Sequence, residues 1–243
     1  MPERLAGATA VVIDVLMATT TLLTILENGA RNVYPVASLE EADEIRAKLD
    51  AADILRGGEQ DAARIEGYDR GPFPEEYVPE VVRDKDVIFV TTNGTRAIAD
   101  AAQADRLLLG TLRNAPAVAR HLEESGTDSV YLVCAGSAGR FDLADFLGAV
   151  AILSYMDTDG RNLNDGATLA LDFVEHRRGR ISEVLEKGRA GRWFVENDRT
   201  DALGFVADVG VSDLIPEVVG GKLRRAGEPK RSRVSDASRR GTG

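Results

Sequence analysis

The stretch that decides the fold is ATAVVIDVLMATTT, residues 8–21. Its first part, residues 8–13, is a short continuous apolar run, which is typical of a strand buried in a parallel sheet. Asp14 follows this run, and a hydroxyl-rich turn at residues 17–21 leads into a helical pattern over residues 20–28. A buried strand, a polar turn and a helix in this order predict the first unit of an α/β fold.

The same alternation continues along the chain. Five more apolar runs predict strands, at residues 32–36, 53–56, 86–91, 106–109 and 129–134. Helical patterns follow most of them, at residues 39–49, 95–102, 115–124 and 143–155. Ser38 and Glu41 form a capping-box pattern, and Asn114 and Asp142 stand at N-cap positions. The alternation predicts a largely parallel sheet covered on both faces, although periodicity alone does not separate buried strands from buried helix segments.

Two regions depart from this rhythm. Residues 57–79, rich in Gly, Pro and charge, are too long for a routine connection, and such loops are functional or disordered. The last third, about residues 165–207, predicts helices at residues 169–176, 181–186 and 200–206, without clear strands between them. We therefore expect one domain over residues 1–221, with an α/β core at 8–155 and a helical part at 165–208. A basic, disordered tail is expected at 222–243.

The charge of the chain limits its class of ligand. The 243 residues carry a net charge of −10. Residues 222–243 hold eight basic and two acidic side chains, a net +6, which leaves −16 for residues 1–221. The strong negative charge of residues 1–221 argues against nucleic acid as the main ligand. The 25 Arg and 5 Lys fit either adaptation to high salt or GC-rich coding.

Other absences in the sequence exclude further classes. No apolar run reaches about 18 residues, so no membrane span is expected. The first residues lack a signal-peptide pattern, so a cytoplasmic location is expected. One Cys and two His argue against a disulfide framework and against a metal site built from those residues.

Polar, glycine-containing loops follow the predicted strands, and the carboxyl ends of parallel strands meet at one edge of a sheet. The candidates after successive strands are Asp14 and Thr19, then Glu59, then Thr92, Asn93, Gly94, Thr95 and Arg96, then Asn114, and finally Gly136. Helices opened by such loops favour anions at their N-termini, and Asp14 and Glu59 are hard oxygen ligands of the kind that Mg²⁺ takes. Asp14 as a simple helix cap, and residues 91–95 as a plain strand-to-helix turn, are the alternatives. The residues alone predict an α/β enzyme that binds a small anion.

Five motifs in order resemble the 2-phosphosulfolactate phosphatase family. They are residues 11–21, Gly58-Glu59 with residues 67–71 and 74–77, residues 91–97, Asn114-Ala115, and Cys134-Ala135-Gly136 followed by residues 143–147. The resemblance covers roughly residues 8–155, with a weaker match at Asp208 and residues 214–216. Each motif is short, but five in the same order are specific.

The resemblance implies a three-layer α/β/α sandwich and an Mg²⁺-dependent phosphatase acting on a small, anionic, phosphorylated 2-hydroxy acid. In the family this reaction releases sulfolactate and phosphate on the route to coenzyme M. Asp14 and Glu59 would be metal or acid/base carboxylates, and Arg96 would offer a bidentate fork to phosphate or carboxylate. The residues that would bind substrate or complete the site are Thr19, Thr92, Asn93, Gly94, Thr95, Asn114, Gly136 and Asp145. A homo-oligomer is left open.

Three positions depart from the family pattern. Met17 stands where the family has Arg, Pro72-Phe73 where it has Asn-Ser, and Ala144 where it has a carboxylate. An Arg in a phosphate site makes charge-assisted bonds of roughly 1.5–3 kcal/mol each, which Met cannot replace. The alternative hypothesis is therefore a catalytically degenerate paralogue that binds an anionic metabolite without hydrolysing it.

Overall fold

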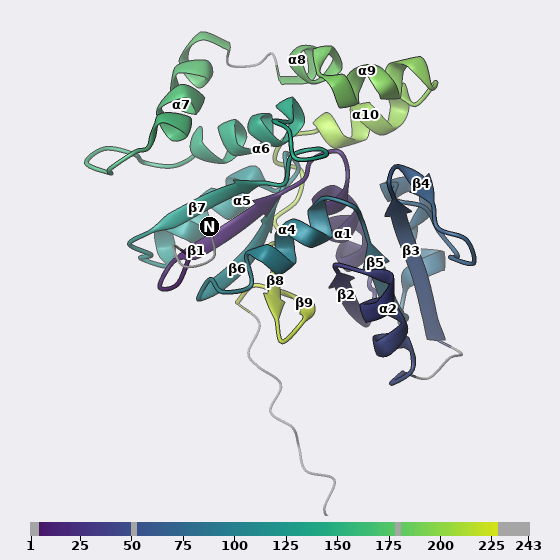
Figure 1. Cartoon of the computed structure of the whole chain (residues 1–243). Helices are drawn as coiled ribbons and strands as arrows, with labels where there is room; N and C mark the ends of the chain where they lie inside the picture. The colour runs from purple at the N-terminus through teal and green to yellow at the C-terminus, as the bar shows by residue number, and fades with distance from the viewer. Residues whose placement is uncertain (1–4, 50–52, 178–180, 228–243) are drawn as a thin grey trace, which may run out of the picture.

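A computed structural model describes residues 5–49, 53–177 and 181–227. In this part of the chain, nine strands form one sheet in the order β4-β3-β5-β2-β9-β8-β6-β1-β7 (Figure 1). The strands are β1 (Thr9–Ile13), β2 (Asn32–Val36), β3 (Ile54–Gln60), β4 (Ala63–Arg64), β5 (Asp86–Val90), β6 (Arg106–Gly110), β7 (Val130–Cys134), β8 (Pro216–Val219) and β9 (Lys222–Arg225). The helices are α1 (Ala18–Glu27), α2 (Leu39–Arg46), the 3₁₀ turn η3 (Pro74–Glu76), α3 (Pro79–Val82), α4 (Gly94–Asp100), α5 (Ala115–Glu124), α6 (Leu143–Leu153), α7 (Asp165–Arg177), α8 (Ile181–Lys187), α9 (Arg189–Glu196) and α10 (Thr200–Ala207).

The six predicted strands are confirmed, and they form two triplets whose members run parallel to one another. β1 pairs with β6 and β7, and β5 pairs with β2 and β3, all in parallel. The sheet as a whole is mixed, however, because β4, β8 and β9 are antiparallel to their neighbours. The α/β class is therefore confirmed, whereas the expectation of a largely parallel sheet holds only within each of these two triplets.

The β8–β9 hairpin corrects one expectation. The segment from residue 222 was expected to be a disordered tail, but β9 begins there and lies inside the sheet. The strands PEVV and KLRR are four residues long and carry no alternating pattern, so the sequence gives no strand signal. The remainder of the predicted tail, residues 228–243, lies outside the described residues.

The hairpin joins two parallel half-sheets. It contacts β2 through the pair Val33–Leu223 and β6 through the pair Leu108–Glu217. One half contains β3, β5 and β2, and the other contains β6, β1 and β7. The loops that leave β5 and β1 belong to different halves, and they meet where Gly94 lies against Asp14.

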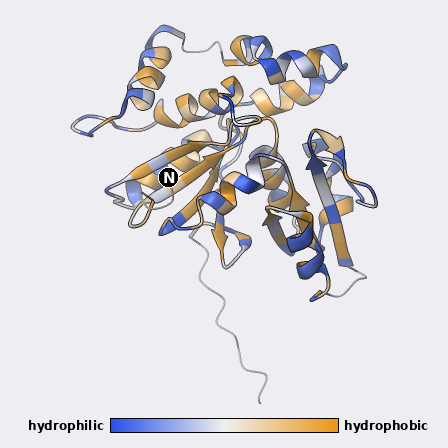
Figure 2. Ribbon diagram, viewed as in Figure 1, coloured by the Kyte–Doolittle hydropathy of each residue, from blue (hydrophilic) through white to orange (hydrophobic). Residues whose placement is uncertain are grey.

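Helices pack on both faces of the sheet. Side chains alternate along β1, so that Val11 and Ile13 share an apolar cluster with α5 and α6, while Ala10 and Val12 share another with α1 and α4. Strands β1 and β5 are accordingly apolar along most of their length, whereas helices such as α5 and α9 carry both apolar and polar residues (Figure 2). No helix in the described ranges is both long and apolar enough to cross a membrane.

The helical last third is confirmed, with α9 as a helix that the sequence did not predict. Helices α6 to α10 gather at one end of the sheet, above β1 and β7 in Figure 1.

Asp142 caps α6 as expected, because its Oδ1 accepts the N–H of Ala144 at 2.9 Å. Ser38 likewise caps α2, with Glu41 reaching back to the N–H of Ala37.

Candidate active site

Asp14 lies directly after β1, buried at the start of α1. The backbone N–H groups of Met17 and Ala18, at the N-terminal end of α1, interact with its carboxylate, although the N-cap position of the helix is Met17. Thr19 holds this turn from inside: its Oγ1 accepts the N–H of Asp14 at 3.0 Å and lies 2.8 Å from the carbonyl oxygens of Asp14 and Gly110. Because Thr19 is fully buried and occupied in this way, it positions Asp14 and has no free group for a substrate.

The N-terminus of α4 approaches Asp14 very closely. A Cβ atom added at Gly94 would lie 2.4 Å from Oδ2 of Asp14 and 2.4 Å from Cβ of Ala18. Real Cβ atoms do not come this near to other atoms, so only glycine lets the two helix starts meet at this carboxylate. The structure thus brings together two loops that the sequence placed after different strands.

Glu59 ties the long loop to the same place. Its Oε1 accepts the N–H of Thr92 at 2.7 Å, and its Oε2 accepts the hydroxyl of Thr92 at 3.0 Å and the N–H of Ala62 at 2.7 Å. Asn93 makes a corresponding link on the other side, because its Oδ1 accepts the N–H of Ala138 at 3.1 Å. Glu59, Thr92 and Asn93 therefore fix the loop that leads into α4.

Asp145 connects α6 to this arrangement. Its Oδ1 accepts the N–H of Val15 at 3.0 Å, and its Oδ2 accepts the N–H of Gly136 at 2.8 Å. Asp142 stands three residues earlier and is also buried. We call Asp14, Asp142 and Asp145 the carboxylate cluster.

Burial and mutual repulsion make this cluster reluctant to ionise. Burial raises the pKa of Asp14 from 3.8 to about 7 against the opposing effect of its two backbone hydrogen bonds, and the charges of Asp142 and Glu59 add to the rise. Burial, followed by the charges of Asp14 and Asp142, raises the pKa of Asp145 well above its usual range. A cation or a shared proton would offset this repulsion, and strongly shifted carboxylates of this kind are typical of functional sites.

Two predicted site residues use their polar groups inside the protein. The hydroxyl of Thr95 lies 2.8 Å from the carbonyl oxygen of Thr91 and accepts its N–H, and the side chain is fully buried. Asn114 does not cap α5 with its side chain; its Oδ1 accepts the N–H of Thr111, and its Nδ2 donates to the carbonyl oxygens of Leu109 and Leu214. Arg96 lies in the first turn of α4 and is exposed.

Comparison with known proteins decides the family. The family model for 2-phosphosulpholactate phosphatase matches residues 1–221. This chain belongs to that family. It is 40% identical over 223 residues to a "Probable 2-phosphosulfolactate phosphatase" of Symbiobacterium thermophilum, covering 91% of this chain and 95% of that protein. Proteins of the same name from Clostridium acetobutylicum and Caldanaerobacter subterraneus are 41% and 38% identical, over 91% and 88% of this chain and 94% and 89% of their own lengths.

The three departures from the 2-phosphosulfolactate phosphatase pattern lie in one apolar cluster. Met17 and Ala144 are buried in it, and Phe73 packs against it. Phe73 also stacks on Trp193 of α9, with ring centroids 6.3 Å apart and planes 9° apart. These side chains therefore attach the long loop and the α1 turn to the helical last third by apolar contact.

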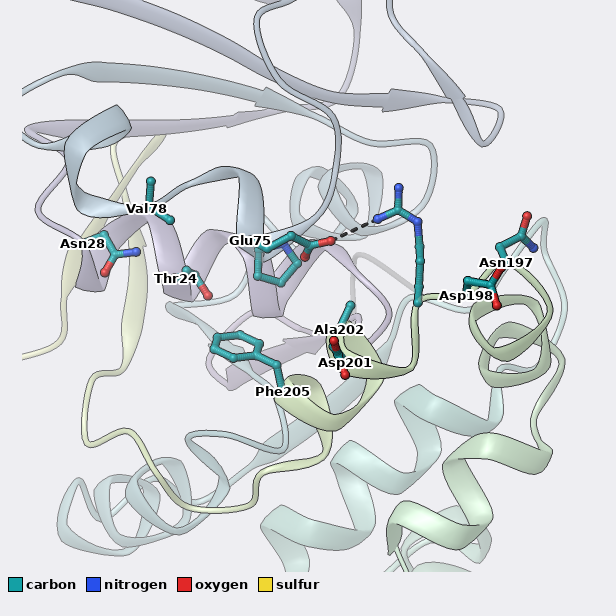
Figure 3. A pocket seen from close by; sticks show the side chains of 11 residues that line it. Thr24, Asn28, Glu75, Val78, Asn197, Asp198, Asp201, Ala202 and Phe205 are labelled. Carbon is teal, nitrogen blue, oxygen red and sulfur yellow. Dashed lines mark hydrogen bonds and ion pairs between the residues drawn. The ribbon is translucent and has the colours of Figure 1, made fainter.

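A polar contact reinforces that attachment. Nη1 of Arg199 lies 3.0 Å from Oε1 of Glu75, and both residues line a cavity of about 560 Å³ between η3, α1 and α10 (Figure 3). The guanidinium also lies 3.8 Å from the centre of the Phe73 ring. Because Arg199 is engaged by both groups, it fixes the helical part against the long loop rather than supplying charge to the carboxylate cluster.

Sequence reasoning missed Asp142 as a member of the site and missed Arg189 entirely. Asp142 was recognised only as a helix cap, although its spacing of three from Asp145 on one helix start could have indicated that the two carboxylates share a face. Arg189 lies 3.5 Å from Asp142, between Nη2 and Oδ2. No local signal could have found that contact, because α9 itself was not predicted.

Proposed function

We propose that this chain is an Mg²⁺-dependent phosphatase that hydrolyses the phosphate ester of 2-phosphosulfolactate, or of a closely similar 2-hydroxy acid. Family membership supports the reaction class. The observation that carries the site is the meeting of the Asp14 carboxylate with the N-terminus of α4 at Gly94. In the family this reaction belongs to the route to coenzyme M, and a cytoplasmic location fits that role.

The first task of such a site is to hold phosphate. At the start of α4 the N–H of Thr95 is bound by the hydroxyl of Thr91, and Arg96 in the same turn can offer a charge-assisted fork to an anion. Thr92 and Asn93 keep this turn in place through Glu59 and Ala138. We therefore assign the phosphate position to the start of α4, beside Asp14.

The second task is to move a proton. A carboxyl group with a pKa of about 7 is divided between its two protonation states at neutral pH, so Asp14 can give or take a proton at Oδ2 when no cation is bound to it. Phosphate ester hydrolysis needs both operations, because the attacking oxygen loses a proton and the leaving oxygen gains one.

The donor chemistry of the site fits magnesium. Magnesium sites use one or two carboxylates together with waters and substrate phosphate oxygens. Within the described residues no group of three or more His, Cys, Asp or Glu forms a metal cage, so the ion would depend on Asp14 and Glu59. Their charges repel each other in the structure, which a divalent cation would relieve. When bound, magnesium would supply charge neutralisation to the phosphate oxygens.

The test is phosphate release by the purified chain from 2-phosphosulfolactate, with Mg²⁺ and with a chelator. We expect turnover with Mg²⁺ and a loss of at least about 100-fold in Asp14→Asn, because a positioned acid/base group contributes 10²–10⁴-fold. Asp213→Asn is the matched control, since the Asp213 side chain is 93% exposed and pairs with Arg120 on α5. Full turnover in Asp14→Asn would refute the site assignment.

A second outcome is favoured by a specific observation. Met17, Phe73 and Ala144 place apolar groups where the family pattern is polar or charged, and all three serve packing in this chain. If sulfolactate raises the melting temperature while no phosphate is released from any phosphorylated hydroxy acid, the degenerate paralogue is the better description.

A further inference from the structure

Arg189 is the cation of the carboxylate cluster. It is the first residue of α9, and its Nη2 lies 3.5 Å from Oδ2 of Asp142. Asp142 is buried and its Oδ1 is engaged by the N–H of Ala144, so its second oxygen is the one that faces the guanidinium. Among the ion pairs between described residues, this is the one that includes a member of the cluster.

The position of Arg189 is fixed by the fold. The turn between α8 and α9 packs on the start of α6, where a Cβ at Gly188 would lie 3.5 Å from Cβ of Leu143. Further along α9, Phe194 is buried in the same cluster that holds Met17. The helix that carries Arg189 is thus anchored at both ends beside the site.

The guanidinium nevertheless keeps donors for a ligand. Its side chain is 46% exposed, and the contact with Asp142 is longer than a hydrogen bond. A guanidinium has five N–H donors in a planar fork, of which Asp142 faces one edge. No second polar partner of this side chain occurs among the residues that the structure describes.

Three other arginines already have partners. Arg113 donates to the carbonyl oxygen of Phe205, lies 3.7 Å from the centre of that ring and has only 12% of its side chain exposed. Arg70 donates to the carbonyl oxygen of Asp69. Arg199 is held by Glu75 and Phe73.

We propose that Arg189 forms a second anion subsite, which binds the acidic group of the substrate that is distal to its phosphate. This inference rests on the proposed function. The phosphate lies at the start of α4 on one side of Asp14, whereas Arg189 approaches the cluster from Asp142 at the start of α6. A substrate with two separated anionic ends meets a cationic or N–H donor at each end in this arrangement. Asp142 acts as a positioning residue that aims the guanidinium.

The subsite would bind an oxyanion of the substrate, which is either a carboxylate or a sulfonate. Three substrates distinguish these two groups: 2-phosphosulfolactate has both, phospholactate has the carboxylate alone, and phenyl phosphate has neither. We expect Arg189→Met to raise KM for 2-phosphosulfolactate by about 10- to 100-fold with little change in kcat, as removal of a charge-assisted bond predicts. KM for phenyl phosphate should not change. An increase for phospholactate as well assigns the carboxylate, and an increase for 2-phosphosulfolactate alone assigns the sulfonate.

Two controls separate binding from structure. Arg120→Met removes another arginine that pairs with an aspartate, at 3.1 Å from Asp213 on the exposed side of α5, and should leave all three KM values unchanged. Arg189→Lys keeps the charge and should recover part of the affinity but not the fork. Equal changes in KM for all three substrates, or no change for any, would overturn the proposal.

A binding assay keeps the inference independent of turnover. Sulfolactate carries both distal groups and no phosphate, so it should raise the melting temperature of the wild type and of Arg120→Met, but not of Arg189→Met. Equal stabilisation of Arg189→Met would overturn the subsite. Wild-type protein that releases no phosphate contradicts the proposed function instead, and the sulfolactate measurement still decides the role of Arg189.

Discussion

The close approach at Gly94 makes Gly94→Ala the most informative single substitution. The added methyl carbon would lie 2.4 Å from Cβ of Ala18 and 2.4 Å from Oδ2 of Asp14, whereas ordinary contacts begin near 3.4 Å. Cβ of Ala18 is fixed to the backbone of α1, so it cannot rotate out of the way. Relief therefore requires the start of α4 to move by about 1 Å relative to Asp14.

The expected effect is much larger on catalysis than on stability. A displacement of about 1 Å in a catalytic arrangement costs about 100-fold in rate. Overpacking lowers the free energy of unfolding by about 1–3 kcal/mol. Alanine is a better helix former than glycine, which raises the free energy of unfolding by about 1 kcal/mol. We expect Gly94→Ala to remain folded, to lose about 100-fold in kcat/KM and to unfold with about 1 kcal/mol less free energy.

The assay is phosphate release at saturating Mg²⁺, together with urea unfolding of the same preparation. Gly204→Ala in α10 is the matched control, because a Cβ there meets nothing within 4 Å. It should keep full activity and gain about 0.5–1 kcal/mol of stability. A folded Gly94→Ala variant with activity within threefold of the wild type would refute the role of the close approach.

Two further predictions concern stability. The pKa of Asp14 is about 7 in the folded protein and 3.8 in the unfolded chain. Between about pH 4 and pH 7 the folded protein therefore binds a proton at Asp14 that the unfolded chain does not bind. The contribution of this group to stability falls as pH rises through that window. Between pH 5 and pH 7 the free energy of unfolding of metal-free Asp14→Asn, measured in urea, should therefore fall less than that of the metal-free wild type. An equally steep fall in both proteins would contradict the raised pKa. Leu223→Ala should cost about 2–5 kcal/mol, because this buried side chain packs where the hairpin meets β2. A cost below about 0.5 kcal/mol, no larger than for exposed Val211→Ala, would show that the hairpin does not hold the half-sheets together.

Much of the site could be predicted because its residues follow local signals. Apolar runs end at Ile13, Val90 and Cys134, and the residues after such strands meet at one edge of a parallel sheet. Asp14, Gly94 and Gly136 were expected at that edge for this reason, and the structure places Asp14 against Gly94, and Gly136 against Asp145.

The roles of individual polar residues could not be predicted in the same way. Thr19 and Thr95 carry hydroxyl groups in the right loops, but both are fully buried and bonded to the backbone. Whether a hydroxyl faces a ligand or a carbonyl oxygen depends on the side-chain orientation that packing selects, and the sequence pattern is the same in both cases.

The sequence by itself determined six strands, the helices that follow most of them and the polar loops at the strand ends, because apolar periodicity and turn residues act over a few positions. Only the tertiary structure decided that a hairpin without strand signal closes the gap between two half-sheets, and that Arg189 stands beside Asp142. Both depend on contacts between segments far apart in the chain, where the available space and the neighbouring charges select the partner.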